Sequence, residues 1–198
     1  MKLRVIAQEP ILCFDLENRP SAYWYDGQTT SEITAFGWKW SNERNVRYML
    51  LQNDGTFVDD TGETLQDCEA YEFFVQELQN AALVFGHNIR QHDLPILNAA
   101  LIRRKMPKLR PILTHDTHKD MTRRKDLSVS LENLTKLLEI GGKKMGMAQS
   151  EWEEANRLTP QGIEKAKKRV TSDVLLQIKL RNELRKLGYL RAPKIWAP

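Results

Sequence analysis

Short apolar runs separated by turn residues recur through the first part of the sequence. The first of these, residues 11–17, follows Pro10 and ends in carboxylates, which is typical of a strand in the middle of a sheet. Polar residues at 42–45 separate two further runs and predict a hairpin between them. The other runs that we interpret as strands are residues 33–40, 46–51, 81–85 and 112–114. The pattern therefore predicts about five strands.

Apolar residues spaced three and four positions apart mark the helical segments. The longest segment begins at Thr159-Pro160, a favourable cap followed by a proline in the first turn, and ends before Gly188. The predicted helices cover residues 64–80, 93–105, 130–140 and 160–187. Strands interspersed with helices predict a mixed α/β fold with a central sheet flanked by helices. We expect a single domain over residues 1–198, with mobile segments near 143–158 and 189–198.

The composition is that of an ordinary globular protein, with 41% hydrophobic and 28% charged residues. The sequence contains no run of about 18 apolar residues, so we expect no membrane partner. Its two cysteines are too few for a disulfide framework, which favours a cytoplasmic location.

The charges are distributed unevenly along the chain. Residues 1–99 carry 7 basic and 15 acidic side chains, whereas residues 100–198 carry 23 basic and 11 acidic ones. This asymmetry indicates an acidic cluster and a basic surface within one protein, and a basic surface suits a polyanion such as a nucleic acid. Solvated helix faces would give the same counts, so charge alone leaves both interpretations open.

Asp15 and Glu17 lie two residues apart at the end of the first predicted strand. Side chains at positions i and i+2 of a strand point to the same face, so the two carboxylates converge. Like charges held together are unfavourable unless a cation joins them, and oxygen ligands suit a hard ion such as Mg²⁺ or Mn²⁺. The pair also has a simpler interpretation as ordinary polar residues at a strand end.

Three further aspartates lie at the expected start of a helix or in the apolar stripe of one. Asp93 opens a predicted helix, where aspartate is a favoured cap, and capping and metal binding are compatible roles. Asp116 is interpreted as a helix cap after the short strand. Asp173 lies within the apolar stripe of the last helix, where an unpaired charge would be costly. Its partner would be either Arg169, one turn earlier, or a metal ion shared with the strand carboxylates.

Three segments of the sequence resemble the motifs of the DEDD superfamily of 3′–5′ exonucleases. Phe14-Asp15-Leu16-Glu17-Asn18 is similar to the first motif. Gly86-His87-Asn88, followed by Asp93-Leu94-Pro95, is similar to the second, and Ser172-Asp173-Val174 resembles the third. The resemblance covers about residues 11–184 and is closest to the exonucleases related to polymerase proofreading domains.

The resemblance implies a ribonuclease H-like α/β fold and hydrolysis of phosphodiester bonds at the 3′ ends of single-stranded DNA or RNA. It also implies two divalent ions, Mg²⁺ or Mn²⁺. The catalytic and metal-binding positions that it implies are Asp15, Glu17, Asp93 and Asp173. The substrate-binding positions that we expect are Leu16, Asn88, Arg169 and Tyr23. Tyr23 has packing within its loop as an alternative role.

The sequence departs from the family pattern just before the last aspartate. Other members have a tyrosine four residues or a histidine five residues before it, and that side chain orients the attacking water. Here these positions hold Arg169 and Lys168. Arginine cannot act as a base, and lysine can do so only if its pKa is strongly lowered. On a continuous helix Lys168 points roughly 140° away from Asp173, so it reaches the site only if the helix begins later.

Three roles for these two residues stay open. In the first, Lys168 replaces the histidine as the base or water-orienting group. In the second, Lys168 or Arg169 contacts the scissile phosphate, and water activation is left to the metal. In the third, the protein is catalytically weak and mainly binds nucleic acid. The alternative water-orienting groups, each also interpretable as structural, are His87, His92 and His115.

We therefore expect a metal-dependent 3′–5′ exonuclease with a non-standard third motif. The alternatives are a catalytically weak or inactive accessory protein that binds nucleic acid, and a structure-specific endonuclease on the same fold. The four acidic positions favour the exonuclease, whereas the missing tyrosine or histidine favours the accessory role. The sequence contains no polymerase or helicase segment, so a role in replication or repair would need a partner protein in trans.

Overall fold

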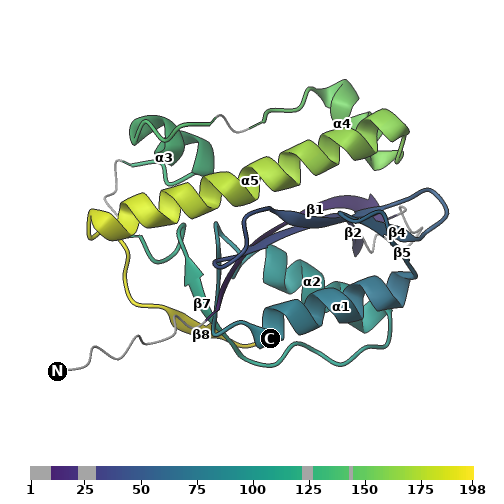
Figure 1. Ribbon diagram of the computed structural model, residues 1–198, viewed down its shortest axis with the longest axis horizontal. Helices are drawn as coiled ribbons and strands as arrows, with labels where there is room; N and C mark the ends of the chain where they lie inside the picture. The colour runs from purple at the N-terminus through teal and green to yellow at the C-terminus, as the bar shows by residue number, and fades with distance from the viewer. Residues whose placement is uncertain (1–9, 22–29, 122–126, 143–144) are drawn as a thin grey trace.

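The computed structural model describes residues 10–21, 30–121, 127–142 and 145–198, and the predicted substrate contact Tyr23 lies outside these residues. The described chain forms one sheet of eight strands in the order β5-β4-β3-β2-β1-β6-β7-β8, with five helices packed around it (Figure 1). The strands are β1 (Ile11–Ser21), β2 (Thr30–Trp40), β3 (Arg47–Leu51), β4 (Phe57–Asp59), β5 (Thr64–Leu65), β6 (Leu83–Gly86), β7 (Ile112–Asp116) and β8 (Lys194–Trp196). The helices are α1 (Asp67–Asn80), α2 (Asp93–Arg103), α3 (Leu131–Leu137), α4 (Gln149–Asn156) and α5 (Pro160–Lys186).

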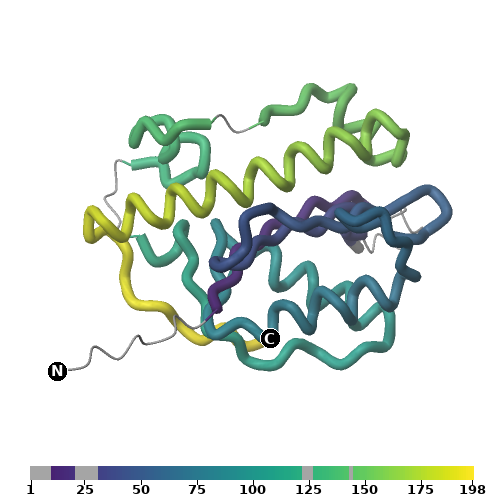
Figure 2. The backbone as a smooth tube through the Cα atoms, viewed as in Figure 1, coloured from purple at the N-terminus to yellow at the C-terminus, as the bar shows by residue number. Residues whose placement is uncertain are grey.

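The sheet is mixed, and β1 lies in its middle. β1 runs antiparallel to β2 on one side and parallel to β6 on the other. The strands from β2 to β5 are antiparallel to one another, whereas β7 is parallel to β6. The chain then returns at its C-terminal end as β8, antiparallel to β7, as the tube in Figure 2 shows. This order confirms the predicted α/β class and is consistent with a ribonuclease H-like fold.

Helices cover both faces of the sheet (Figure 1). α5 lies across one face with α3 and α4 beside it, and α1 and α2 lie against the other face. The larger apolar core fills the space between the sheet and the pair α1 and α2. Within it the ring centre of Phe74 lies 5.8 Å from that of Phe14 and 4.7 Å from that of Phe36. These aromatic contacts join α1 to the two central strands.

The alternation of side chains along β1 decides which face carries the carboxylates. Phe14 is buried in the core against α1 and α2, whereas Cys13 packs against Val174 of α5. Because successive side chains of a strand point to opposite faces, Asp15 and Glu17 lie on the face that α5 covers. The carboxylates of β1 and the last helix therefore share one side of the sheet.

The structure contains three strands and one helix that the sequence pattern does not predict. β4, β5 and β8 contain three, two and three residues, too few for a period of two to be recognised, so the predicted count of about five strands is too low. α4 and β8 fall within the segments predicted to be mobile, so part of each segment has regular structure. α1 begins at Asp67 rather than at residue 64, because Thr64 and Leu65 pair with β4.

The long helix α5 begins where the sequence predicts. The side chain of Thr159 accepts a 3.1 Å hydrogen bond from the backbone of the first turn, and Pro160 occupies that turn. Further along, the helix comes close to the sheet at Gly37, where an added Cβ would lie 2.7 Å from Cγ2 of Val170. Gly37 pairs with Asp15 in the β1–β2 register, so this close approach brings α5 over the carboxylates.

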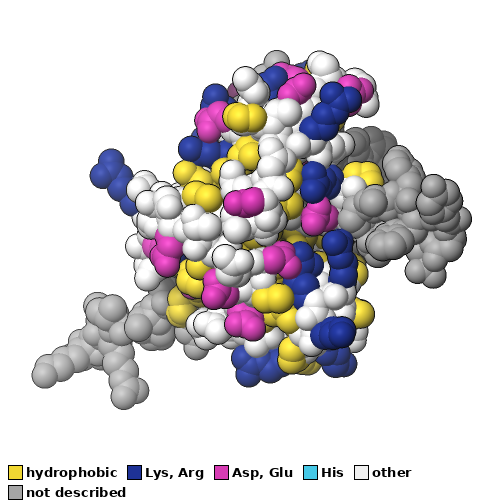
Figure 3. Space-filling view, turned by 90° about the vertical axis from the view of Figure 1, so that its right-hand side faces the viewer, with side chains coloured by type: hydrophobic (Ala, Val, Ile, Leu, Met, Phe, Trp, Pro, Cys, Tyr) yellow, Lys and Arg dark blue, Asp and Glu magenta, His cyan; other side chains and the backbone are white. Residues whose placement is uncertain are grey.

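Figure 3 shows the face of the molecule that lies at the right of Figure 1, and on it acidic and basic side chains are interspersed. The separate basic surface that the charge asymmetry indicates is therefore not seen on this face. None of the helices in the described ranges has the length and apolar character needed to cross a bilayer.

Candidate metal centre

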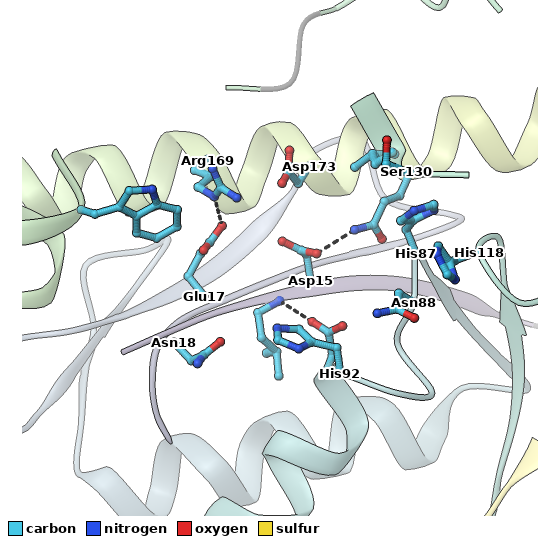
Figure 4. A pocket seen from close by; sticks show the side chains of 15 residues that line it. Asp15, Glu17, Asn18, His87, Asn88, His92, His118, Ser130, Arg169 and Asp173 are labelled. Atoms are coloured by element: carbon cyan, nitrogen blue, oxygen red, sulfur yellow. Dashed lines mark hydrogen bonds and ion pairs between the residues drawn. The ribbon is translucent and has the colours of Figure 1, made fainter. Parts of the chain in front are cut away.

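Three carboxylates from the central strand and the last helix converge in a pocket of about 400 Å³ (Figure 4). Asp15, Glu17 and Asp173 each offer an oxygen, and these atoms lie within 4.8 Å of one another. Glu17 is 8% exposed and Asp173 is 4% exposed, so little water screens their charges. Oxygen ligands that converge in this way suit a hard divalent ion such as Mg²⁺ or Mn²⁺.

Burial and repulsion raise the pKa of Asp15 well above its ordinary value. Burial is the largest cause, and the negative charges of Asp93, Asp173 and Glu17 add to it. A hydrogen bond from Gln177 acts in the opposite direction, because it favours the charged carboxylate. The cluster is therefore stabilised either by taking up a proton or by binding a cation.

Asp93 lies at the edge of this cluster. It is the first residue of α2, and its Oδ1 accepts a 3.2 Å hydrogen bond from the backbone N–H of Leu16. Burial is the main cause that raises the pKa of Asp93 to about 7, with smaller contributions from Glu17 and Asp116. Asp93 lines the same pocket, but it does not belong to the described group whose oxygens lie within 4.8 Å of one another.

Gln177 contacts the cluster, and the sequence pattern did not single it out. This side chain is 1% exposed, and its Nε2 donates a 2.7 Å hydrogen bond to Oδ1 of Asp15. Its Oε1 accepts a hydrogen bond from Sγ of Cys13 at 3.7 Å. The available signal was a second polar residue in the apolar stripe of α5, four positions after Asp173 and on the same helix face.

Arg169 extends from α5 to Glu17, as Figure 4 shows. Its Nε lies 2.6 Å from Oε1 of Glu17, and its Nη1 donates a 3.0 Å hydrogen bond to the carbonyl of Met145. The guanidinium lies over the ring of Trp152, 4.7 Å from the ring centre. The helical spacing offers Arg169 as a partner for Asp173, and its long side chain also reaches Glu17 on β1 and Met145 in the segment before α4.

Lys168 is not brought to the site. Its Nζ lies 3.6 Å from Oε1 of Glu164, and its side chain is 62% exposed. Among the described residues, those that line the pocket do not include it. α5 is continuous from Pro160, so Lys168 points to solvent. The later helix start that a catalytic Lys168 requires is not present in this structure.

Asn88 lies in the loop between β6 and α2 and lines the pocket. Its φ of 67° is in the left-handed region, which asparagine adopts more readily than most residues. The side-chain oxygen of Asn88 is buried and has no hydrogen-bond partner in the described part of the chain. That oxygen is an acceptor available to a bound group.

Asp116 holds this loop in place and does not cap a helix, because β7 is followed by a turn. Its Oδ1 accepts a 2.9 Å hydrogen bond from the backbone N–H of Asn88, and its Oδ2 accepts one of 3.0 Å from Arg90. The N–H groups of His118 and Lys119 donate to the same carboxylate at 3.0 and 3.1 Å. The buried carboxylate therefore joins the loop that carries Asn88 to the end of β7.

Three histidines, His87, His92 and His118, line the pocket. Nδ1 of His87 lies 2.9 Å from Oγ1 of Thr117, and the rings of His87 and His118 meet edge-on with their centres 5.3 Å apart. The sequence motifs do not point to His118, although it follows β7 at the edge where the parallel strands β6 and β7 both end. His115, an alternative water-orienting group in the sequence, does not belong to the described lining, and its Nε2 lies 3.0 Å from a backbone carbonyl of the C-terminal segment.

The fold is similar to that of the family B DNA polymerase from the hyperthermophilic archaeon Pyrobaculum calidifontis, with a TM-score of 0.61 and 14% sequence identity. The similarity covers 89% of this chain and 24% of the polymerase, so the chain spans about a quarter of that protein's length. At this identity the similarity shows a shared fold. No protein-family model matches the sequence, and a comparison with curated protein sequences gives no match.

Proposed function

We propose that the protein is a divalent-metal-dependent 3′–5′ exonuclease of the DEDD type that acts on single-stranded ends of DNA or RNA. The observation that carries the proposal is the convergence of Asp15, Glu17 and Asp173 in one open pocket, with oxygens within 4.8 Å of one another. Carboxylate sites of this kind bind the divalent ions that nucleases use for phosphodiester hydrolysis.

Two observations favour nucleic acid over other substrates of metal-dependent hydrolysis. The order and local context of the carboxylates along the chain resemble the DEDD motifs, with the closest resemblance to proofreading exonucleases. A structural neighbour is a DNA polymerase, which agrees with that resemblance although it was found from the fold alone. Both observations support a role in nucleic-acid metabolism.

The residues of the pocket divide into two groups in this proposal. The metal ligands are Asp15, Glu17, Asp93 and Asp173. The substrate contacts are Leu16, Asn88 and Arg169. Two Mg²⁺ or Mn²⁺ ions at such a site supply charge stabilisation and an activated water. Arg169 has the charge and the donors to bind a phosphate oxygen, and it has no capacity to act as a base.

A cleavage time course on 5′-labelled single-stranded DNA and RNA, with Mg²⁺, Mn²⁺ or a chelator, tests the proposal. Asp15→Asn is the variant that should lose activity, and Asp54→Asn, which changes an exposed carboxylate of a turn outside the pocket, is its matched control. We expect a ladder that shortens from the 3′ end, requires metal and is absent for Asp15→Asn. No cleavage of either polymer by the folded wild-type protein would exclude an exonuclease for simple single strands.

Arg169 favours a second candidate, an accessory protein that binds nucleic acid with weak or no catalysis. Four residues before Asp173, where orthodox members have a water-orienting tyrosine, this chain has the arginine. Loss of a general base usually lowers the rate by about 10²–10⁴-fold and does not abolish it. Salt-dependent binding of the same oligonucleotides without cleavage would support the accessory role. Cleavage of circular single-stranded DNA would instead indicate an endonuclease.

A further inference from the structure

The guanidinium of Arg169 lies in the carboxylate pocket and is held from three sides. It contacts Oε1 of Glu17 at 2.6 Å, the carbonyl of Met145 at 3.0 Å and the ring of Trp152 at 4.7 Å from the ring centre. The side chains of Arg169 and Glu17 are only 15% and 11% exposed, so water screens this ion pair less than it screens a surface pair. Arg169 therefore supplies a positive charge to a cluster of carboxylates.

The carboxylate that Arg169 contacts is also a ligand of the proposed metal site. A guanidinium and a divalent ion both bind carboxylate oxygens, and two cations in one shielded pocket repel each other. An ion that binds Glu17 must therefore weaken or replace the contact with Arg169. The contacts of Arg169 with Met145 and Trp152 do not involve the carboxylate, so they can keep the guanidinium at the wall of the pocket after this exchange.

We infer that Arg169 is a positioning residue that acts as an internal counter-cation. It holds Glu17 in the metal-free protein and lowers the affinity of the site for divalent ions, so it sets the metal concentration at which the site fills. This inference rests on the proposed metal site at Asp15, Glu17 and Asp173. Neither a tyrosine nor a histidine at this position would have the same effect, because neither carries a permanent positive charge.

Binding of Mn²⁺, measured by isothermal titration calorimetry without nucleic acid, tests this role separately from catalysis. Arg169→Ala removes the ion pair, and Arg169→Gln removes the charge while keeping a hydrogen-bond donor. Lys168→Ala is the matched control, because it removes the same charge from a neighbouring exposed side chain that pairs with Glu164. We expect both Arg169 variants to bind Mn²⁺ at least about fivefold more tightly than the wild type, and Lys168→Ala to stay within about twofold of it.

Thermal melting gives a second readout that a merely structural arginine would not produce. Without metal, Arg169→Ala should melt below the wild type, because the carboxylates lose their counter-charge. Added Mn²⁺ should then raise its melting temperature by more than it raises that of the wild type. For the inference to hold, Mn²⁺ must raise the melting temperature of Arg169→Ala by more than it raises that of Lys168→Ala.

The possible failures of the inference and of the proposed function can be told apart. Equal or weaker Mn²⁺ binding by both Arg169 variants, with the fold intact by circular dichroism and a wild type that binds Mn²⁺, would overturn the inference and leave the metal site standing. No Mn²⁺ binding by the wild type or by either Arg169 variant would overturn the proposed metal site, and the inference with it. Asp15→Asn, which lacks one ligand, gives the reference for a damaged site.

Discussion

The side-chain amide of Gln177 donates a 2.7 Å hydrogen bond to Oδ1 of Asp15, which joins α5 to β1 one helical turn beyond Asp173. The amide is buried, and its oxygen accepts a hydrogen bond from Cys13, so both of its ends have a partner. A donor held in this way orients the carboxylate and favours its charged form. The geometry of the candidate metal ligand therefore depends on a neutral side chain outside the three motifs.

We expect Gln177→Ala to weaken Mn²⁺ binding by about 10- to 100-fold, because the orientation of a metal ligand usually depends on such a partner. Gln177→Met keeps the volume without the donor and should weaken binding in the same way. Gln76→Ala, which removes an exposed amide on α1, should leave the affinity unchanged. Calorimetric titration measures all three, and an unchanged affinity in Gln177→Met would show that the bond to Asp15 does not orient the ligand.

Asp116 should be important for stability as well as for the site. The carboxylate is fully buried and accepts hydrogen bonds from four backbone N–H groups, two of them in the loop that carries Asn88. Asp116→Ala leaves these donors without their acceptor, so we expect the free energy of unfolding to fall by about 2–4 kcal/mol. Urea denaturation followed by circular dichroism measures the loss. Glu72→Ala, which removes an exposed carboxylate of α1, is the control and should change stability little.

The close approach of α5 at Gly37 gives a prediction about packing. A Cβ at this position would lie 2.7 Å from Cγ2 of Val170 and 3.3 Å from its carbonyl oxygen, so Gly37→Ala must displace Val170 on the helix that carries Asp173. We expect it to cost about 1–3 kcal/mol of stability and to weaken Mn²⁺ binding. The double variant Gly37→Ala/Val170→Ala removes the closest contacts and should recover part of the affinity. If the double variant binds no better than Gly37→Ala, the contact with Val170 does not position the ligand.

The raised pKa of Asp93 predicts how the stability of the metal-free protein depends on pH. Burial raises this pKa from 3.8 to about 7, so between these values the folded protein keeps a proton that the unfolded chain releases. Stability therefore falls as pH rises through this range, and the raised pKa of Asp15 acts in the same direction. With a chelator present, we expect a higher melting temperature at about pH 5.5 than at about pH 8.

Two protein variants, measured in the same way, identify the cause of this pH dependence. Asp93→Asn should reduce it and leave the contribution of Asp15, because the amide does not titrate, whereas Asp54→Asn should leave it as in the wild type. Added Mn²⁺ should raise the melting temperature mainly at about pH 8, above the pKa of about 7 of Asp93, where protons compete less with the metal for the carboxylates. A melting temperature that rises from the lower to the higher pH, with and without Asp93, would contradict the burial argument.

Local patterns in the sequence determined on which faces the carboxylates lie. Side chains alternate between the two faces of a strand, which places Asp15 and Glu17 on the same side of β1. The helical repeat places Asp173 in the buried stripe of α5. The cap at Thr159 and the proline after it determined where α5 begins. Each of these features depends on residues a few positions apart, so it can be read without knowing how the elements pack.

Only the tertiary structure decided which groups these carboxylates contact. Arg169 lies one turn from Asp173 on α5, yet its Nε binds Glu17, which is 152 positions away in the sequence. Lys168, its neighbour, points to solvent, and Gln177 reaches Asp15 on β1. The short strands β4, β5 and β8 likewise exist because a neighbouring strand supplies their hydrogen bonds. These contacts depend on the distance between elements that are remote in the sequence, and the packing of α5 on the sheet determines that distance.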